Sequence, residues 1–142
     1  AGRIAEPTLA AVRDWRALRS HLDILLISGN HDRHAGDPPD ELAITCMDAP
    51  VAFGPLVLAH HPVVSADGYT LAGHLHPAIA LVGSGRRRER LPCFHLGGQV
   101  GVLPAFGSFT GTALGRPRAG DRIVVIADDE VAEIIVPVEL ES

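Results

Sequence analysis

The sequence predicts an α/β fold whose sheet is at least partly parallel, and three observations lead to this prediction. A helical pattern over residues 6–22 runs directly into a continuous apolar stretch at residues 23–28. Several later apolar stretches end in loops that carry histidines, and residues 121–140 have the pattern of a β-hairpin. A helix followed by a strand that is apolar on both faces is typical of parallel sheets, because helices cover both of their faces.

Length and composition are those of one globular domain, and we expect residues 1–142 to form it. A chain of 142 residues can bury a real core, and a hydrophobic fraction of 46% is ordinary for a folded protein. No apolar run approaches the roughly 18–20 residues of a membrane span, and the first residues lack the features of a secretory signal. We therefore expect no membrane association and a cytoplasmic location.

Charge and cysteine content narrow the function classes. The net charge of -5 argues against a generally basic nucleic-acid binder, although residues 86–90 are RRRER and residues 121–142 carry seven acids and one arginine. Cys46 and Cys93 lie far apart and form no CxxC pair, so we expect two buried thiols in a reducing cytoplasm. Eight histidines, six of them within residues 31–76, are the more informative feature.

The first predicted elements form half of a βαβ unit. Within residues 6–22, Leu9 and Val12 are followed at helical spacing by Trp15 or Arg16, with a proline near the start. The apolar run that comes next has the length of a strand. The first strand of such a unit would precede residue 1, and the chain begins without methionine. We therefore expect a fragment or the product of a late start.

Short strands and turns are predicted along the rest of the chain. Strand-like apolar runs occupy residues 43–49, 55–60, 70–72, 78–83 and 93–98. Residues 84–92 are predicted to be a polar turn, and the glycine- and phenylalanine-rich residues 102–115 a loop. In the hairpin that follows, Asp128 and Asp129 occupy the turn.

Three of the apolar stretches end in polar motifs, namely GNHD at residues 29–32, HHP at residues 60–62 and GHLH at residues 73–76. Ligands bind outside the carboxyl ends of strands in α/β sheets, so we expect the three motifs to converge. If residues 74–76 are extended, His74 and His76 face the same way. Imidazole nitrogen with amide or carboxylate oxygen suits Zn, Mn or Fe. A single histidine more often caps a loop, but the three motifs together favour a metal site.

These three motifs, in this order, resemble the later blocks of the calcineurin-like metallophosphoesterases. The resemblance implies a four-layer α/β/β/α sandwich that carries two divalent metal ions, Mn, Fe or Zn. It implies that Asn30, His60 and His74 are ligands of the second metal and that His76 is a ligand of the first. The choice of His60 follows the family's His-x-Pro arrangement; His61 then lies behind the ligand or at the surface, and which of the two binds is left open.

The same resemblance assigns the catalytic residues and a narrower type. It implies that His31 contacts the scissile phosphate and assists the leaving group, with Asp32 holding its ring. The stretch LPAFGSFTG at residues 103–111, with GNHDR, GHLHP and the arginines before CFH, resembles bacterial ligase-associated DNA damage response endonucleases of the PdeM type. These are encoded near a DNA ligase and a helicase, which makes DNA a candidate substrate and those two enzymes candidate functional partners.

Some histidines and aromatic residues stay outside these motifs. We expect His34 to lie in a loop near the mouth of the site and His95 to be structural. Phe106 and Phe109 are predicted to pack in the core rather than to stack on bases. The RRRER run suits either phosphate binding or a solvated turn.

The sequence departs from the family at its start. The family's Asp-x-His strand and its Gly-Asp block, whose aspartate bridges the metals, are absent from these 142 residues. The expected function is hydrolysis of phosphodiester or phosphomonoester bonds by a two-metal-activated water. The alternative is a truncated, inactive remnant or a binding module of the same fold. We expect the chain alone to bind at most one ion weakly, to be inactive or nearly so, and to be marginally stable.

Overall fold

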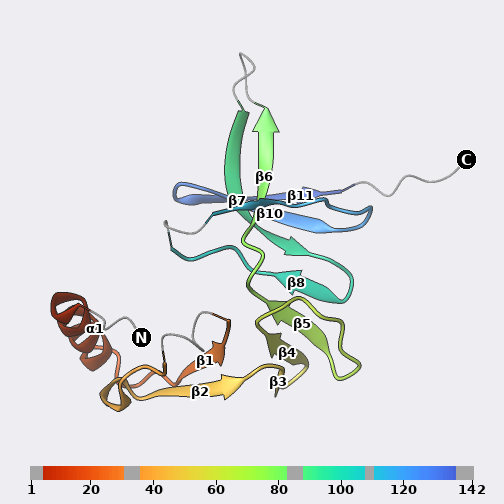
Figure 1. Cartoon of the computed structure of the whole chain (residues 1–142). Helices are drawn as coiled ribbons and strands as arrows, with labels where there is room; N and C mark the ends of the chain where they lie inside the picture. The colour runs from red at the N-terminus through yellow and green to blue at the C-terminus, as the bar shows by residue number, and fades with distance from the viewer. Residues whose placement is uncertain (1–4, 31–35, 83–87, 108–110, 137–142) are drawn as a thin grey trace, which may run out of the picture. The chain divides into compact units, whose positions relative to one another are not determined.

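A computed structural model describes residues 5–30, 36–82, 88–107 and 111–136. The chain divides into two compact units, residues 1–51 and residues 52–142, which are taken in turn. Across the described residues the fold is mixed α/β, mostly sheet with one α-helix (Figure 1). This confirms the predicted fold class at the level of α/β.

In the first unit, α1 (Glu6–Ala17) follows Ala5, whose backbone is extended, and has proline in its first turn. Proline suits that position because its missing N–H needs no partner there. The helix is shorter than predicted, since it was expected to reach residue 22. The side chain of Arg16 donates to the carbonyl oxygens of Arg19 at 2.5 Å and Leu22 at 3.0 Å. These bonds hold the chain after α1 in a non-helical path.

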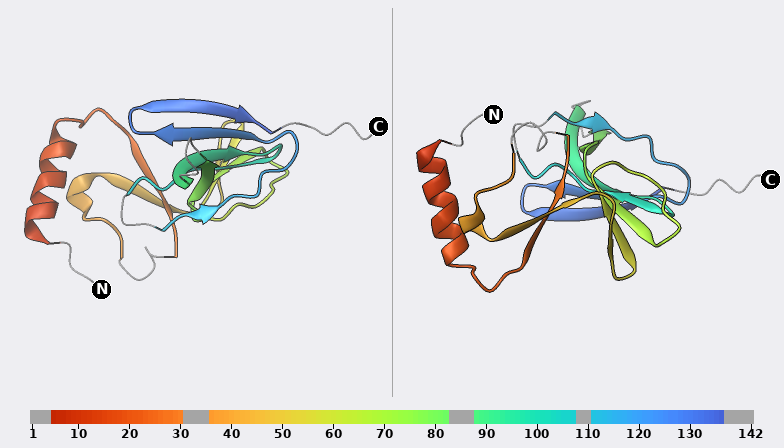
Figure 2. Two further views of the ribbon diagram at one scale, coloured as in Figure 1. Left: turned by 90° about the horizontal axis from the view of Figure 1, so that it is seen from above. Right: turned by 60° about the horizontal axis from the view of Figure 1, so that its bottom comes forward.

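The strand predicted at residues 23–28 is confirmed as β1 (Ile24–Ser28), and its partner is β2 (Ile44–Asp48). The two strands are parallel, in register from Ile24 opposite Ile44 to Ser28 opposite Asp48. The short 3₁₀ helix η1 (Asp40–Leu42) precedes β2 and buries Leu42. A hydrogen bond links η1 to α1: the side chain of Arg16 donates to the carbonyl oxygen of Leu42 at 2.8 Å. Figure 2 shows α1 beside the two strands.

The second unit is built on a nine-stranded sheet with the strand order β11-β10-β7-β8-β5-β4-β3, in which β6 pairs with β7 and β9 pairs with β6. The strands are β3 (Val51–Phe53), β4 (Leu56–Ala59), β5 (Tyr69–Ala72), β6 (Pro77–Val82), β7 (Arg88–Leu96), β8 (Val100–Val102), β9 (Ala113–Leu114), β10 (Arg122–Ala127) and β11 (Glu130–Ile135).

The middle of this sheet is parallel, as the apolar runs predicted. β4 pairs in parallel with β5, and β5 pairs in parallel with β8, so that Ala59 lies opposite Ala72 and Ala72 opposite Val102. The carboxyl ends of these three strands therefore meet at one edge. The loops that follow them leave from that edge.

Outside these strands, the pairs β10–β11, β7–β10, β6–β7 and β7–β8 are antiparallel, whereas β6 and β9 are parallel, and this part of the sheet contains the core of the second unit. β10 and β11 form the predicted hairpin, with Asp128 and Asp129 at the turn; Asp128 has a φ of 52°. β7 pairs with both β8 and β10. Cys93, Ile123 and Val125 are at most 2% exposed and pack together as the core cluster. Burial raises the pKa of the Cys93 thiol, so this cysteine stays protonated and apolar.

Two predicted loops are wrong in part. The predicted polar turn at residues 84–92 includes residues 88–92, which are the first half of β7 and pair with β6 from Val82–Arg88 to Ala78–Pro92. In Figure 1, β6 and this half of β7 project as a two-stranded arm. The arginines in this half of β7 are exposed to solvent, so their charge is compatible with a strand. The predicted loop at residues 102–115 contains the last residue of β8 and the whole of β9.

Two buried thiols were expected, but only Cys93 is buried; Cys46 on β2 is half-buried. None of the helices in the described ranges has the length and apolar character needed to cross a membrane.

Candidate metal centre

Three histidines of the second unit lie together at the carboxyl ends of β4 and β5. His60 follows the last residue of β4 directly, and His74 comes two residues after the last residue of β5. The strands are adjacent and parallel, so both loops start from the same edge of the sheet. His74 Nδ1 lies 3.0 Å from His60 Nε2. The structure thus brings together two residues that the sequence motifs predicted to converge.

The third member of this histidine cluster is His61. Its ring centroid lies 4.2 Å from that of His74 and 4.7 Å from that of His60. Ligand atoms of His60, His61 and His74 are all within 4.8 Å of one another. Sequence reasoning left His61 open as a substitute for His60. In the folded chain both rings belong to the cluster.

The geometry of the cluster fits one transition-metal ion. Two imidazole nitrogens bound to a tetrahedral ion at about 2.0–2.1 Å are about 3.3 Å apart, close to the separation seen between His60 and His74. His60 is half-buried, while His61 and His74 are exposed, so an ion could enter from solvent. Neutral imidazole is a good ligand for Zn, Mn and Fe, which are the ions expected from the sequence.

The loop that carries His74 has an unusual backbone. His74 has a φ of 66° and His76 a φ of 47°, both in the left-handed region that non-glycine residues seldom adopt. The N–H of Leu75 donates to the carbonyl oxygen of Gly73 at 2.8 Å, which closes a three-residue turn around His74. Residues 74–76 are therefore not extended, and the condition under which His74 and His76 would face the same way is not met. Strained backbone of this kind costs of order 1–3 kcal/mol and is found mainly at functional sites.

His76 belongs to the same loop but not to the cluster. Its Nδ1 lies 3.0 Å from the carbonyl oxygen of Gly111. A carbonyl oxygen can only accept, so Nδ1 carries the proton and donates it. The lone pair of the neutral ring is then on Nε2, which is the arrangement that metal-binding histidines adopt when a backbone carbonyl orients them.

The remaining predicted site residues belong to the first unit. Asn30 is exposed and follows buried Gly29 just after β1 ends. It is therefore at the carboxyl end of a parallel strand, as expected. His31 and Asp32, the two predicted catalytic residues, and His34 lie outside the described residues.

His95, expected to be structural, forms a hydrogen bond to Asp121 that sequence reasoning missed. Its Nε2 lies 2.7 Å from Oδ2 of Asp121, and the two side chains are 21% and 13% exposed. Burial opposes ionisation of Asp121, but hydrogen bonds from His95 and from the N–H of Arg118 outweigh it and lower the pKa of this carboxyl group. The partners are 26 residues apart and share no motif, so spacing could not have identified them.

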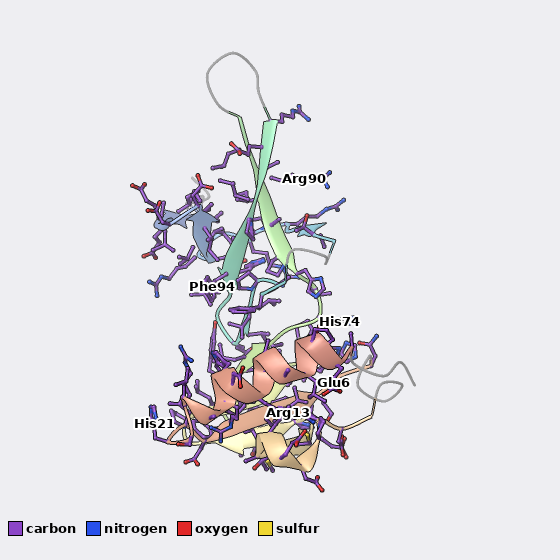
Figure 3. The ribbon with its side chains drawn as sticks, turned by 90° about the vertical axis from the view of Figure 1, so that its left-hand side faces the viewer. Glu6, Arg13, His21, His74, Arg90 and Phe94 are labelled. Atoms are coloured by element: carbon purple, nitrogen blue, oxygen red, sulfur yellow. The ribbon has the colours of Figure 1, made fainter. Side chains whose placement is uncertain are left out.

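The prediction that Phe106 packs in the core is wrong. Its side chain is fully exposed in the loop that follows β8. Phe109 lies outside the described residues. Arg88 and Arg90 are exposed on β7; Figure 3 labels Arg90 on this strand, and His74 in the loop after β5.

One of three comparisons with known proteins finds a similar protein, and that protein is a nuclease. No family model and no curated protein matches the chain. Among solved structures, a crystal structure of Pseudomonas putida nuclease MPE matches with a TM-score of 0.79 and 42% sequence identity. The match covers 92% of this chain and 63% of that chain. This chain therefore spans less than two thirds of the length of the nuclease that it resembles.

Proposed function

We propose that this chain is part of a metal-dependent phosphoesterase that hydrolyses phosphodiester bonds, with DNA as the leading candidate substrate. The histidine cluster at the carboxyl ends of β4 and β5 is the observation that carries the proposal. The 42% identity to a nuclease over nearly the whole of this chain supports it independently of the cluster.

The proposal assigns the chain to the calcineurin-like superfamily and to its PdeM type, with the four-layer sandwich of that family. It includes a cytoplasmic location and a functional association with a DNA ligase and a helicase. The family assignments and the association with a ligase and a helicase rest on the motifs GNHD, HHP, GHLH and LPAFGSFTG.

His60 and His74 hold one divalent ion in this proposal, with His61 beside them and Asn30 as the further ligand that the family pattern implies. His76 uses Nε2 for a second ion, since its Nδ1 proton is donated to Gly111. Bound divalent ions supply positive charge at phosphate oxygens and lower the pKa of a nearby water toward about 7. The donor set, imidazole nitrogen with amide oxygen, suits Mn, Fe or Zn.

His31 has a separate role, because it acts on the phosphate rather than on the ions. It stabilises the charge that develops on the leaving alkoxide or protonates that alkoxide, a contribution of typically about 10²- to 10⁴-fold in rate. Asp32 accepts a hydrogen bond from the ring and fixes its orientation. Substitution of His31 by alanine in the full-length protein therefore lowers turnover far more than metal content.

Metal reconstitution tests the proposal. The metal-free full-length protein is loaded with Mn, Fe or Zn, and hydrolysis of bis-p-nitrophenyl phosphate is compared before and after loading. We expect turnover to require the ion, and His74→Ala to lose both bound metal and turnover. His21→Ala is the matched control, because His21 is exposed after α1 and belongs to no motif. Metal binding without metal-dependent turnover supports the inactive binding module instead, and unchanged metal content in His74→Ala contradicts the assignment of the cluster.

A further inference from the structure

The second unit has an open hollow of about 520 Å³, and none of the residues that line it has been assigned a catalytic role. It lies between the turn that joins β7 to β8 and the segment that leads into β10, and its walls include His95, Gly98, Arg116 and Arg118. Ligand pockets in proteins are typically about 300–1,000 Å³, so this hollow is large enough for a phosphate group with part of a nucleotide.

Two arginines give the hollow its positive charge. Arg116 and Arg118 are exposed, and within the described part of the chain neither guanidinium group forms an ion pair. A guanidinium group is always charged at physiological pH, and its planar set of donors matches phosphate oxygens. Arg118 also contributes to the lowered pKa of Asp121, and both exposed guanidinium groups can be reached by an anionic ligand from solvent.

Asp121 is the one acidic side chain among the lining residues, and its charge is already engaged. Its Oδ2 accepts hydrogen bonds from His95 Nε2 at 2.7 Å and from the N–H of Arg118 at 2.8 Å. The side chain is 13% exposed, so its repulsion of a phosphate at the open side is reduced. The same two bonds fix the His95 ring and the backbone at Arg118, which makes this wall rigid.

The opposite wall of the hollow contains two glycines, Gly97 and Gly98, of which Gly97 lies close to Asp121. A Cβ atom at Gly97 would lie 3.4 Å from Asp121 Oδ1 and 3.2 Å from the carbonyl oxygen of Val100. A Cβ atom at Gly98 would meet nothing within 4 Å. The turn therefore packs tightly behind the His95–Asp121 pair at Gly97, while at Gly98 it presents bare backbone to the hollow, where a ligand can approach closely.

The hollow adjoins the histidine cluster without sharing a residue with it. Pro62 and Val64 are among its lining residues, and Pro62 follows His61 directly in the chain. Consecutive Cα atoms are about 3.8 Å apart, so the lining begins one residue away from the cluster. A strand of nucleic acid at the cluster could reach the hollow with a neighbouring phosphate.

We propose that this hollow is a second phosphate-binding site, formed by Arg116 and Arg118 around the His95–Asp121 pair and independent of any metal. We assign to it a backbone phosphate of the polynucleotide whose scissile phosphate lies at the histidine cluster. Only this choice of ligand rests on the proposed function; phosphate binding itself does not.

Binding by metal-free protein, after the chelator has been removed, tests the proposal without requiring catalysis. Fluorescence anisotropy of a fluorescein-labelled single-stranded oligonucleotide is measured for the protein and for R116Q/R118Q. We expect the double variant to bind about 10-fold or more weakly. The slope of the logarithm of its binding constant against the logarithm of salt concentration should be smaller in magnitude by about 1.4, because each of two phosphate contacts contributes about 0.7 on a single strand.

The matched control is R88Q/R90Q, which removes two exposed arginines of β7 that do not line the hollow. We expect this control to bind more tightly than R116Q/R118Q. If both double variants lose the same oligonucleotide affinity, the loss comes from the change in net charge rather than from the hollow, and the proposal is wrong. Equal binding by R116Q/R118Q and the unmodified protein would also overturn the proposal. Thermal unfolding checks that both variants are folded.

Competition separates the two sources of phosphate. Inorganic phosphate and a mononucleotide are titrated against the labelled oligonucleotide. An oligonucleotide that binds more tightly than either supports a polynucleotide ligand. If inorganic phosphate binds as tightly and R116Q/R118Q abolishes its binding, the site takes free phosphate and the polynucleotide assignment is wrong.

Discussion

Substitution of Gly68 by alanine should separate the parallel strands that carry the histidine cluster. Gly68 comes directly before β5, and Pro55 directly before β4. A Cβ atom at residue 68 would lie 2.5 Å from the carbonyl oxygen of Pro55 and 3.1 Å from its carbonyl carbon. The N–H of Tyr69 donates to that same oxygen at 3.2 Å, so the segments that lead into β4 and β5 cannot move apart without weakening this hydrogen bond.

The expected loss of stability follows from the nature of the clash. Overpacking typically costs about 1–3 kcal/mol, and a clash with backbone rather than with a flexible side chain falls at the upper end, about 3 kcal/mol. Alanine restricts the unfolded chain more than glycine does and returns about 0.4–1 kcal/mol. The free energy of unfolding should therefore fall by about 2 kcal/mol, which lowers Tm by about 4–10 °C in a chain of this size.

Urea unfolding followed by circular dichroism measures this change. Gly98→Ala is the matched control, because its Cβ atom would meet nothing within 4 Å; its free energy of unfolding should stay the same or rise by about 0.5 kcal/mol. If Gly68→Ala and Gly98→Ala unfold at the same urea concentration, the close approach of Gly68 to Pro55 does not contribute to stability and the reasoning is wrong.

The remaining predictions concern the His95–Asp121 pair and the individual histidines. Asp121→Asn should lower the free energy of unfolding by about 1–3 kcal/mol near neutral pH, because a largely buried carboxylate loses charge-assisted hydrogen bonds. The pKa of Asp121 is lowered on folding from an ordinary value of 3.8, so its contribution is complete above that pH and is lost as the pH falls through the folded value. Urea unfolding at pH 6 and pH 3 should give a smaller difference between the protein and Asp121→Asn at pH 3; an unchanged difference would contradict this. Calorimetric metal titration should find that His60→Ala abolishes binding and that His61→Ala weakens it by about 10- to 100-fold, and the reverse order would exchange the roles of the two residues.

The elements that the sequence predicted well are those in which periodicity and length agree with the tertiary structure. The apolar run that becomes β1 and the hairpin of β10 and β11 are examples. The end of α1 could not be predicted, because Leu18 and Leu22 continue the helical spacing while Arg16 binds carbonyl oxygens beyond the helix. The start of β7 was missed because its arginines are polar, whereas the partner strand β6 supplies the apolar side chains.

The candidate site was predictable to the extent that it depends on strand ends. His60 and His74 each follow a strand of a parallel pair, so their proximity followed from topology. The inclusion of His61 depends on the path of a short loop, which spacing does not determine. The exposure of Phe106 and the pairing of His95 with Asp121 depend on contacts between distant segments and left no local pattern.

The location of bound metal tests the central claim most directly. Crystals of the protein soaked in Mn or Zn are measured at the absorption edge of the ion, and an anomalous difference map is computed. The account predicts a peak about 2.0–2.3 Å from the ring nitrogens of His60 and His74, at the carboxyl ends of β4 and β5. A peak bound elsewhere, with none at these two histidines, would contradict it.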